Sequence, residues 1–296
     1  MLVSIVIRTL NEDTHLEELL TAIADQKCVG FSAETVIIDS GSTDNTLTIA
    51  EKFGCRITHI DEADFTFGRS LNMGSAFAKG DILVYVSGHC IPASNDWLEK
   101  LVKPIMDGVS HYTYGRQIGR DTTKFSERQI FKKYFPEYSK IPQDDFFINN
   151  ANSALQRSSW EALQFDEEVT GLEDMELAKR LCESGESVAY VSDAIVFHIH
   201  HETWQQTRRR YEREAIALQR IMPEIHVDLI DAVRFFFAGI FGDWSEALKS
   251  KRFFREFLPV LFFRAAQYIG TYRGNHEHRT LSNKRKHQYY YPTKHY

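Results

Sequence analysis

Apolar and polar positions along the first hundred residues repeat in the order strand, polar loop, helix. An apolar run at residues 2–7 is followed, after a polar segment, by apolar residues at helical spacing through 16–23. The same order recurs at 35–50 and at 56–78, and a continuous apolar run at 82–86 suits a strand that is buried on both faces. This alternation predicts an α/β fold with a mostly parallel sheet flanked by helices.

Parallel strands end at one edge of their sheet, and α/β proteins bind ligands beyond that edge. The polar segments 9–12, 39–44 and 87–92 each follow a predicted strand. We therefore expect these three loops to surround a single crevice.

The middle of the chain is less regular, and its end reads as helical. No linker rich in glycine or serine separates the regions, so we treat residues 1–204 as one domain and residues 205–296 as a helical appendage. The elements predicted after residue 107 are strands at 112–117, 151–155, 188–191 and 195–198, a helix at 173–181, and helices from 203 onward.

The composition is that of a folded globular protein, because 43% of the 296 residues are hydrophobic and 26% are charged. The longest apolar runs are far shorter than the roughly 20 residues of a spanning helix. The N-terminus has neither the basic region nor the small-residue site of a signal peptide, so we expect a cytoplasmic protein. The spacing of the four cysteines matches no metal clip or disulfide framework and indicates reduced, mostly buried thiols.

Charge is divided unevenly along the chain. Residues 1–204 carry a net charge of −14 and residues 205–296 carry +8, and the basic region also holds 17 of the 38 aromatic residues. This combination favours an anionic apolar surface, so we expect helices that lie peripherally on the inner face of the plasma membrane. The alternatives are packing on the rest of the chain or a homodimer, and no nucleic-acid partner is expected. The aromatic and basic residues concerned are Phe235, Phe236, Phe237, Phe241, Trp244, Phe253, Phe254, Phe257, Phe262 and Phe263, with Arg234, Lys249, Lys251, Arg252, Arg255 and Arg264.

Three segments carry a family resemblance. No P-loop, dinucleotide-binding, zincin or nucleophile-elbow motif occurs where its chemistry would need it. Residues 4–12 (SIVIRTLNE), 36–46 (VIIDSGSTDNT) and 171–181 (GLEDMELAKRL) instead resemble the GT-A glycosyltransferases of family 2, and a rhamnosyltransferase-like branch is nearest. The resemblance covers about residues 1–204.

That resemblance implies a GT-A catalytic domain with a nucleotide-sugar half at about 1–107 and an acceptor half at about 108–204. It implies inverting transfer of a sugar from a nucleoside diphosphate sugar to a saccharide or lipid-linked saccharide, in bacterial surface polysaccharide assembly. Two other classes remain open. Sugar-nucleotide synthesis by nucleotidyl transfer uses a similar sheet but usually carries a Gly-rich basic loop after the first strand, and a non-catalytic saccharide-binding relative could lack a working site.

By the same resemblance, Thr9, Asn11 and Glu12 after the first strand and Asp39 after the second hold the nucleotide. A carboxylate only accepts hydrogen bonds, which suits the N–H donors of a base. Turn and cap chemistry is the alternative interpretation of Asp39.

Four further polar or aromatic residues are candidates for donor or acceptor contacts. Arg69 can pair with a diphosphate and Asn72 can fix the neighbouring loop, although a surface salt bridge would equally explain the arginine. Asn152 and Trp160 can hydrogen-bond to and stack on an acceptor sugar, and core or turn roles are the alternative for both.

The sequence departs from the family where an Asp-x-Asp usually coordinates a divalent cation. Ser87 and His89 stand at that position, and His198, with His200 two residues further, stands where the family often supplies a late ligand. Imidazole suits Mn²⁺ better than Mg²⁺, so His89 and His198 are predicted to share one divalent cation, with Mn²⁺ favoured. Direct contact of the histidines with a diphosphate and a purely structural role are the alternatives.

Glu173 and Asp174 open a predicted helix in the acceptor half. An inverting transfer needs one carboxylate to deprotonate the acceptor hydroxyl, which is the role the resemblance gives to Asp174, with Glu173 orienting or binding the acceptor. Favourable charge at a helix N-terminus is the plainer interpretation.

Overall fold

The computed structural model describes residues 1–277 and 281–291, and the chain forms two compact units. The first, called here the sheet unit, comprises Met1–Arg120, Tyr134–Glu168 and Glu173–Ile199. The second, the helical unit, comprises Asp121–Lys133, Val169–Leu172 and the described residues from His200 onward. The functional boundary placed at residue 204 stays a prediction.

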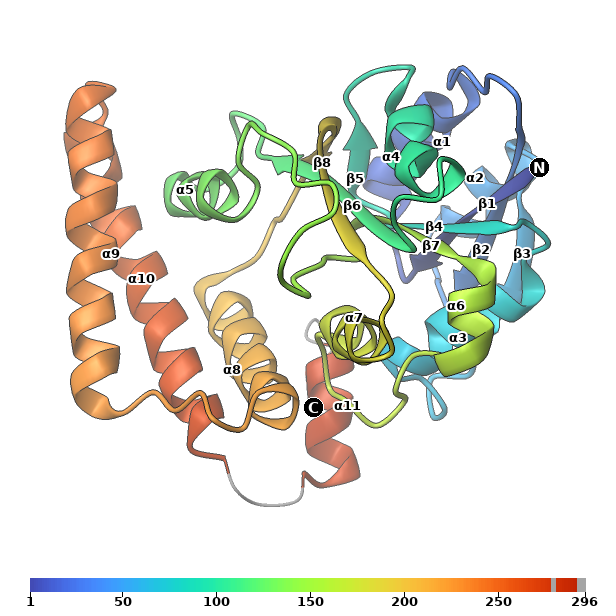
Figure 1. Ribbon diagram of the computed structural model, residues 1–296. Coiled ribbons are helices and arrows are strands. Elements are labelled where there is room, and N and C mark those ends of the chain that lie inside the picture. Colours follow the sequence, from blue (N-terminus) through green and yellow to red (C-terminus); the bar gives the residue numbers. More distant parts are fainter. Residues whose placement is uncertain (278–280, 292–296) are drawn as a thin grey trace. The chain divides into compact units, whose positions relative to one another are not determined.

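The sheet unit is built on an eight-stranded sheet in the order β3-β2-β1-β4-β7-β6-β8-β5 (Figure 1). The first four strands pair in parallel, as do β6 and β8, whereas β7 and β5 run antiparallel to their neighbours. The predicted mixed α/β fold is therefore confirmed. The strands are β1 (Leu2–Thr9), β2 (Ser32–Asp39), β3 (Arg56–His59), β4 (Ile82–Val86), β5 (Cys90–Pro92), β6 (Tyr112–Ile118), β7 (Asn152–Gln156) and β8 (Val188–His198).

Helices cover both faces of this sheet (Figure 1). Ile5 and Ile7 of β1 belong to a buried core with Leu16 of α1 and Trp97 of α4. The opposite face carries α3, whose Gly74 lies so close to Val6 that a Cβ atom there would sit 2.6 Å from its Cγ1. The helices of this unit are α1 (Asp13–Ala24), α2 (Thr46–Lys52), α3 (Phe67–Phe77), α4 (Trp97–Met106), α6 (Arg157–Leu163) and α7 (Glu173–Glu183).

Several elements differ from the sequence prediction. β8 is one strand where two were predicted, because Ser192, at the polar break, is buried and its backbone N–H donates to Ser139 Oγ at 2.9 Å. The short strand β5 and the helices α4, α5 (Phe125–Tyr134) and α6 were not predicted. All four cysteines are free, but only Cys90 is fully buried, so the expectation of mostly buried thiols was wrong.

The helical unit contains most of α5 together with α8 (Trp204–Ile221), α9 (Leu229–Lys249), α10 (Phe253–Asn275) and α11 (Asn283–Tyr290). The predicted helical character of this region is confirmed. α8 begins at Thr203 with a capping box, in which the Thr203 hydroxyl accepts from the Gln206 N–H and the Gln206 side chain accepts from Thr203. In the described part of the chain, no helix is long and apolar enough to cross a membrane.

α8 and α10 lie in close contact (Figure 1). A Cβ atom at Gly270 would sit 2.3 Å from the carbonyl oxygen of Arg208, and one at Gly274 would sit 2.1 Å from that of Glu212. α9 is tied to α10 by a buried ion pair between Arg264 and Asp243 at 2.7 Å. These contacts make α8, α9 and α10 one packed layer of helices.

Candidate active site

The ends of β1 and β2 are joined by side-chain hydrogen bonds. Thr9 and Asp39 are register partners, and the Thr9 hydroxyl donates to Asp39 Oδ1 at 2.9 Å. Asp39 also accepts from the N–H groups of Gly41 and Ser42 at 2.9 Å and from the Ser42 hydroxyl at 2.5 Å. Asp39 is 1% exposed, so in this structure its carboxylate organises the turn.

The loop after β1 meets both other predicted loops. Asn11 adopts a left-handed conformation with φ 55°, and its Oδ1 accepts from the Thr43 N–H at 2.8 Å. Glu12 approaches the loop after β4, where a Cβ atom at Gly88 would lie 2.9 Å from Glu12 Cγ. The predicted convergence of the three loops is thus present within the sheet unit, and Gly88 is required there because a larger residue would displace Glu12.

His89 and His198 are stacked, with ring centroids 5.3 Å apart and an interplanar angle of 25°. Pairing of β5 with β8 brings them together, since Cys90 is the register partner of His198. His89 Nδ1 lies 3.1 Å from Glu12 Oε1, and His198 Nδ1 lies 2.7 Å from Gln117 Oε1.

These contacts determine how the two imidazoles could bind a metal ion. Oxygen acceptors at Nδ1 favour the tautomer that carries its proton on Nδ1, so Nε2 is the nitrogen that would ligate. A ligating histidine usually donates its second ring nitrogen to such an acceptor. The pair His89 and His198 therefore fits a divalent cation that accepts imidazole, such as Mn²⁺. His200 belongs to the helical unit, where its Nδ1 lies 2.8 Å from Glu127 Oε1.

Glu173 and Asp174 begin α7 and are both buried. Asp174 Oδ2 accepts from the Asn150 N–H and Oδ1 accepts from the Met175 N–H, each at 2.8 Å. Burial and, secondly, the neighbouring Glu173 charge raise the pKa of Asp174 to about 7. Glu173 Oε1 lies 3.4 Å from the Arg8 guanidinium, which keeps a cation beside the two carboxyls. A carboxyl with a pKa near neutrality is suited to general-base work.

Arg69 and Asn72 lie on α3 and hold the loop that contains Glu167. Arg69 Nε donates to Glu167 Oε2 at 2.8 Å, while Asn72 Nδ2 donates to Glu167 Oε1 at 3.1 Å and to the Phe165 carbonyl at 2.9 Å. The Arg69 side chain is 38% exposed. Asn72 thus has the loop-fixing contacts considered from the sequence, and Arg69 makes the salt bridge that was its alternative.

Asn152 and Trp160 are both buried, which favours structural roles over acceptor binding. Asn152 is 0% exposed, accepts from Trp97 Nε1 at 2.9 Å and donates to the Ala194 carbonyl at 2.8 Å. Trp160 donates from Nε1 to Asn72 Oδ1 at 3.1 Å. Because the Asn152 amide and the Trp160 indole N–H form hydrogen bonds inside the sheet unit, this geometry does not support the predicted sugar contacts.

Comparison with known proteins identifies the family of this chain. The model of the family described as Glycosyl transferase family 2 matches residues 4–163. The chain belongs to this family. It is therefore a glycosyltransferase, and the resemblance stated from its motifs is confirmed.

Two curated proteins are similar to this glycosyltransferase over much of their length. The O-antigen chain rhamnosyltransferase RfbN of Salmonella typhimurium is 26% identical over 295 residues, which cover 93% of this chain and 90% of that protein. The O-antigen chain rhamnosyltransferase WbaN of Salmonella anatum is 29% identical over 201 residues, covering 64% and 63% of the two chains.

A solved structure supports the same fold. The mannosyltransferase PcManGT from Pyrobaculum calidifontis, in complex with GDP-Man and Mn²⁺, superposes with a TM-score of 0.64 at 17% identity, covering 94% of this chain and 88% of that one. The predicted GT-A type of fold is confirmed.

Three residues of the glycosyltransferase site were not singled out from the sequence. Arg8 lies beside Glu173, Gln117 beside His198, and the Asn150 backbone beside Asp174. An arginine that directly follows the apolar run of β1 is a signal that could have pointed to Arg8. Gln117 is recognised only when β6 pairs with β8, and Asn150 only when the loop before β7 meets the start of α7.

Proposed function

We propose that this glycosyltransferase transfers a sugar, with inversion, from a nucleoside diphosphate sugar to a saccharide acceptor during bacterial surface polysaccharide assembly. Asp174 carries the proposal, because a buried carboxyl with a raised pKa begins α7 within the family's motif. The O-antigen rhamnosyltransferase RfbN, similar over nearly the whole chain, supports both the pathway class and rhamnose as the donor sugar.

In this mechanism, ionised Asp174 accepts the proton of the acceptor hydroxyl. The hydroxyl oxygen forms a bond to the anomeric carbon of the donor from the side opposite the leaving group. The bond from that carbon to the diphosphate oxygen breaks, and the nucleoside diphosphate leaves with the electron pair. Arg8 forms an ion pair with Glu173 and so places a positive charge beside the base, and Glu173 orients the acceptor.

His89 and His198 are proposed to hold a divalent cation through Nε2, with Mn²⁺ favoured over Mg²⁺. Such an ion supplies positive charge to the departing diphosphate. Glu12 and Gln117 fix the two rings by their contacts at Nδ1. The PcManGT structure contains both GDP-Man and Mn²⁺, which supports this assignment.

The loops after β1 and β2 are proposed to form the nucleotide side of the donor site. Asn11 and Glu12 lie on its surface, whereas Thr9 and Asp39 hold the turn that shapes it. Arg69 is proposed to turn from Glu167 toward the donor diphosphate. A half-exposed guanidinium can make that exchange because its present ion pair is weakly held in solvent.

A cytoplasmic position on the inner membrane face is proposed for the helical unit, which would bring the enzyme to a lipid-linked acceptor. Apolar side chains of α9 and α10 are exposed, and Phe254 reaches 95% and Ile230 77% exposure. Lys249 and Arg255 lie among them with side chains 70% and 79% exposed. This mixture supports binding to an anionic interface.

Two predicted membrane contacts are wrong in the structure, because Phe263 and Arg264 are both buried. Arg264 was placed among the basic residues that snorkel to the membrane surface, but it is 7% exposed and pairs with Asp243 inside the helical unit. Exposed apolar helices would also suit a homodimer, which the vesicle experiment below separates from membrane binding.

The function is tested by incubating the enzyme and Mn²⁺ with a panel of nucleoside diphosphate sugars and glycan acceptors. We expect nucleoside diphosphate release that depends on the acceptor and on Asp174. Nucleotidyl transfer would instead consume a nucleoside triphosphate and a sugar phosphate and release diphosphate. Specific saccharide binding with no product formed from any donor would support the non-catalytic alternative.

A further inference from the structure

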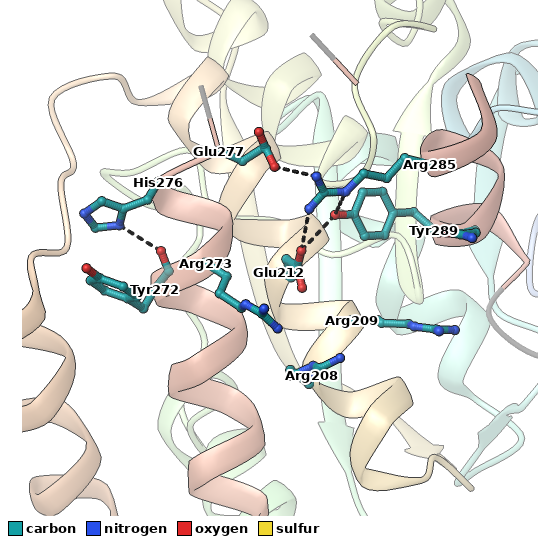
Figure 2. Close-up of a pocket in the computed structure, with 10 residues that line it drawn as sticks. Arg208, Arg209, Glu212, Tyr272, Arg273, His276, Glu277, Arg285 and Tyr289 are labelled. Atoms are coloured by element: carbon teal, nitrogen blue, oxygen red, sulfur yellow. Dashed lines mark hydrogen bonds and ion pairs between the residues drawn. The ribbon is translucent and has the colours of Figure 1, made fainter. Parts of the chain in front are cut away.

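A cavity of about 730 Å³ lies wholly within the helical unit, between α8, α10 and α11 (Figure 2). Its volume lies within the range of small-molecule sites in proteins. Its ten lining residues include four arginines and two glutamates. None of the residues assigned above to catalysis or to the donor lines it.

Both glutamates of this cavity form ion pairs with the same arginine. Arg285 of α11 lies 2.5 Å from Glu277 and 2.8 Å from Glu212. The Tyr289 hydroxyl also donates to Glu212, at 3.1 Å. Figure 2 shows this group of hydrogen-bonded side chains along one side of the cavity.

The lining of the cavity keeps excess positive charge, because four arginines face only two glutamates. Within the part of the chain that the structure describes, no carboxylate lies at ion-pairing distance from either guanidinium. Arg208 Nε is moreover buried without a hydrogen-bond acceptor among the described atoms.

The close packing of α8 against α10 brings Arg208 and Arg273 to the same cavity. Arg208 lies on α8 and Arg273 on α10, and Figure 2 shows both side chains extending into the same space. The close contact of the helices depends on Gly270 and Gly274, where any Cβ atom would collide with α8 carbonyl oxygens. The glycine pair therefore fixes the spacing of the two helix backbones that carry these arginines.

We propose that this cavity is a second anion site, which binds the phosphate or diphosphate group of an organic phosphate through Arg208 and Arg273. Guanidinium groups form paired charge-assisted hydrogen bonds with phosphate oxygens, and two of them converging from facing helices match a group with at least two negative charges. Tyr272 and His276, whose ring centroids lie 4.2 Å apart with the planes inclined by 37°, line the same cavity and offer aromatic contacts to the organic part. The site goes beyond the proposed function, because it lies outside the donor and base residues.

The test is a binding titration on the full chain in EDTA, with inorganic diphosphate as the probe. We expect Arg273→Ala and Arg208→Gln each to weaken binding about tenfold or more, since a hydrogen bond to a charged group is lost. Arg220→Ala, an exposed change on the same α8 helix, is the matched control and should bind as the wild type does. Arg273 is exposed, so its variant is expected to fold. Thermal unfolding of both cavity variants is measured to check that each is folded.

A second arm identifies the source of the phosphate. Vesicles of phosphatidylcholine with and without phosphatidic acid are sedimented with the same variants. Arg273-dependent binding to phosphatidic acid would support a lipid phosphate, and Arg273-dependent binding of soluble diphosphate alone would support a free phosphate. If neither probe binds, or if binding is equal in the wild type and both cavity variants, the site does not exist. Because neither arm measures turnover, this result is independent of the proposed glycosyl transfer.

Discussion

Replacing Asp174 with asparagine should remove general-base catalysis, and the amide nitrogen of the variant can no longer accept one of the two backbone N–H groups that the carboxylate accepts. The variant keeps the side-chain volume but removes the group that accepts the acceptor proton. Loss of general-base action typically lowers the rate about 10²- to 10⁴-fold, and donor binding should be unchanged because Asp174 makes its contacts in the acceptor half.

The buried carboxyl also predicts how stability depends on pH. The pKa of Asp174 is raised to about 7 in the folded state, against about 3.9 in an unfolded chain. Between these values the folded protein binds the proton more tightly, so the free energy of unfolding falls as pH rises. The slope reaches at most about 1.4 kcal/mol per pH unit, and the loss is complete once pH passes the folded pKa. Over the whole window, this amounts to a few kcal/mol.

Two assays follow from this reasoning. Urea unfolding of the wild type and of Asp174→Asn between pH 4 and 8 should show that the wild type loses stability relative to the variant as pH rises. In the pH profile of kcat/KM, the wild type should gain activity through about pH 7. Glu183→Gln, an exposed change in the same α7 helix, is the control and should alter neither. Near-native turnover by Asp174→Asn, with an unchanged stability difference across this range, would refute both parts of the argument.

The remaining predictions concern the metal, a buried ion pair and the membrane. Enzyme freed of metal by EDTA should lose activity and recover it with Mn²⁺ more fully than with Mg²⁺. His89→Ala should weaken Mn²⁺ binding in calorimetry by about 100-fold or more. Full activity without metal would favour direct contact of the histidines with the diphosphate. Arg264→Ala should lower the free energy of unfolding by about 3–5 kcal/mol, because it leaves Asp243 buried and unpaired, and a loss under 1 kcal/mol in urea titrations would contradict that. Phe254→Glu should reduce sedimentation with anionic vesicles at low salt, whereas Val29→Glu, an exposed change in the sheet unit, should not. If the wild type binds no vesicle and forms dimers in ultracentrifugation, the homodimer is favoured.

The fold could be predicted well where apolar runs were short and continuous. β1, β2 and β4 were found because their buried positions read as uninterrupted runs. α5 was missed because its ten residues are mainly polar and only Phe125 and Phe131 supply buried hydrophobic side chains. Helical periodicity is recognised in a sequence only where the apolar stripe is longer than the one in this helix.

The candidate site was partly predictable for a different reason. His89 and His198 were paired from their positions in a resembling motif, and the contact of β5 with β8 brings them together. The acceptor roles given to Asn152 and Trp160 stay predictions, because an amide or an indole can serve a ligand or a buried hydrogen bond, and residue type alone does not distinguish these uses.

Mass spectrometry of the acceptor tests the central claim most directly. A saccharide acceptor is incubated with the enzyme, Mn²⁺ and a nucleoside diphosphate rhamnose, and the product mass is compared with that from Asp174→Asn. Our account predicts an acceptor heavier by one deoxyhexose residue, formed with one nucleoside diphosphate released per sugar, and almost none with the variant. Equal product from the folded variant, or an unchanged acceptor across a full panel of donor sugars and acceptors with folded wild-type enzyme, would contradict it.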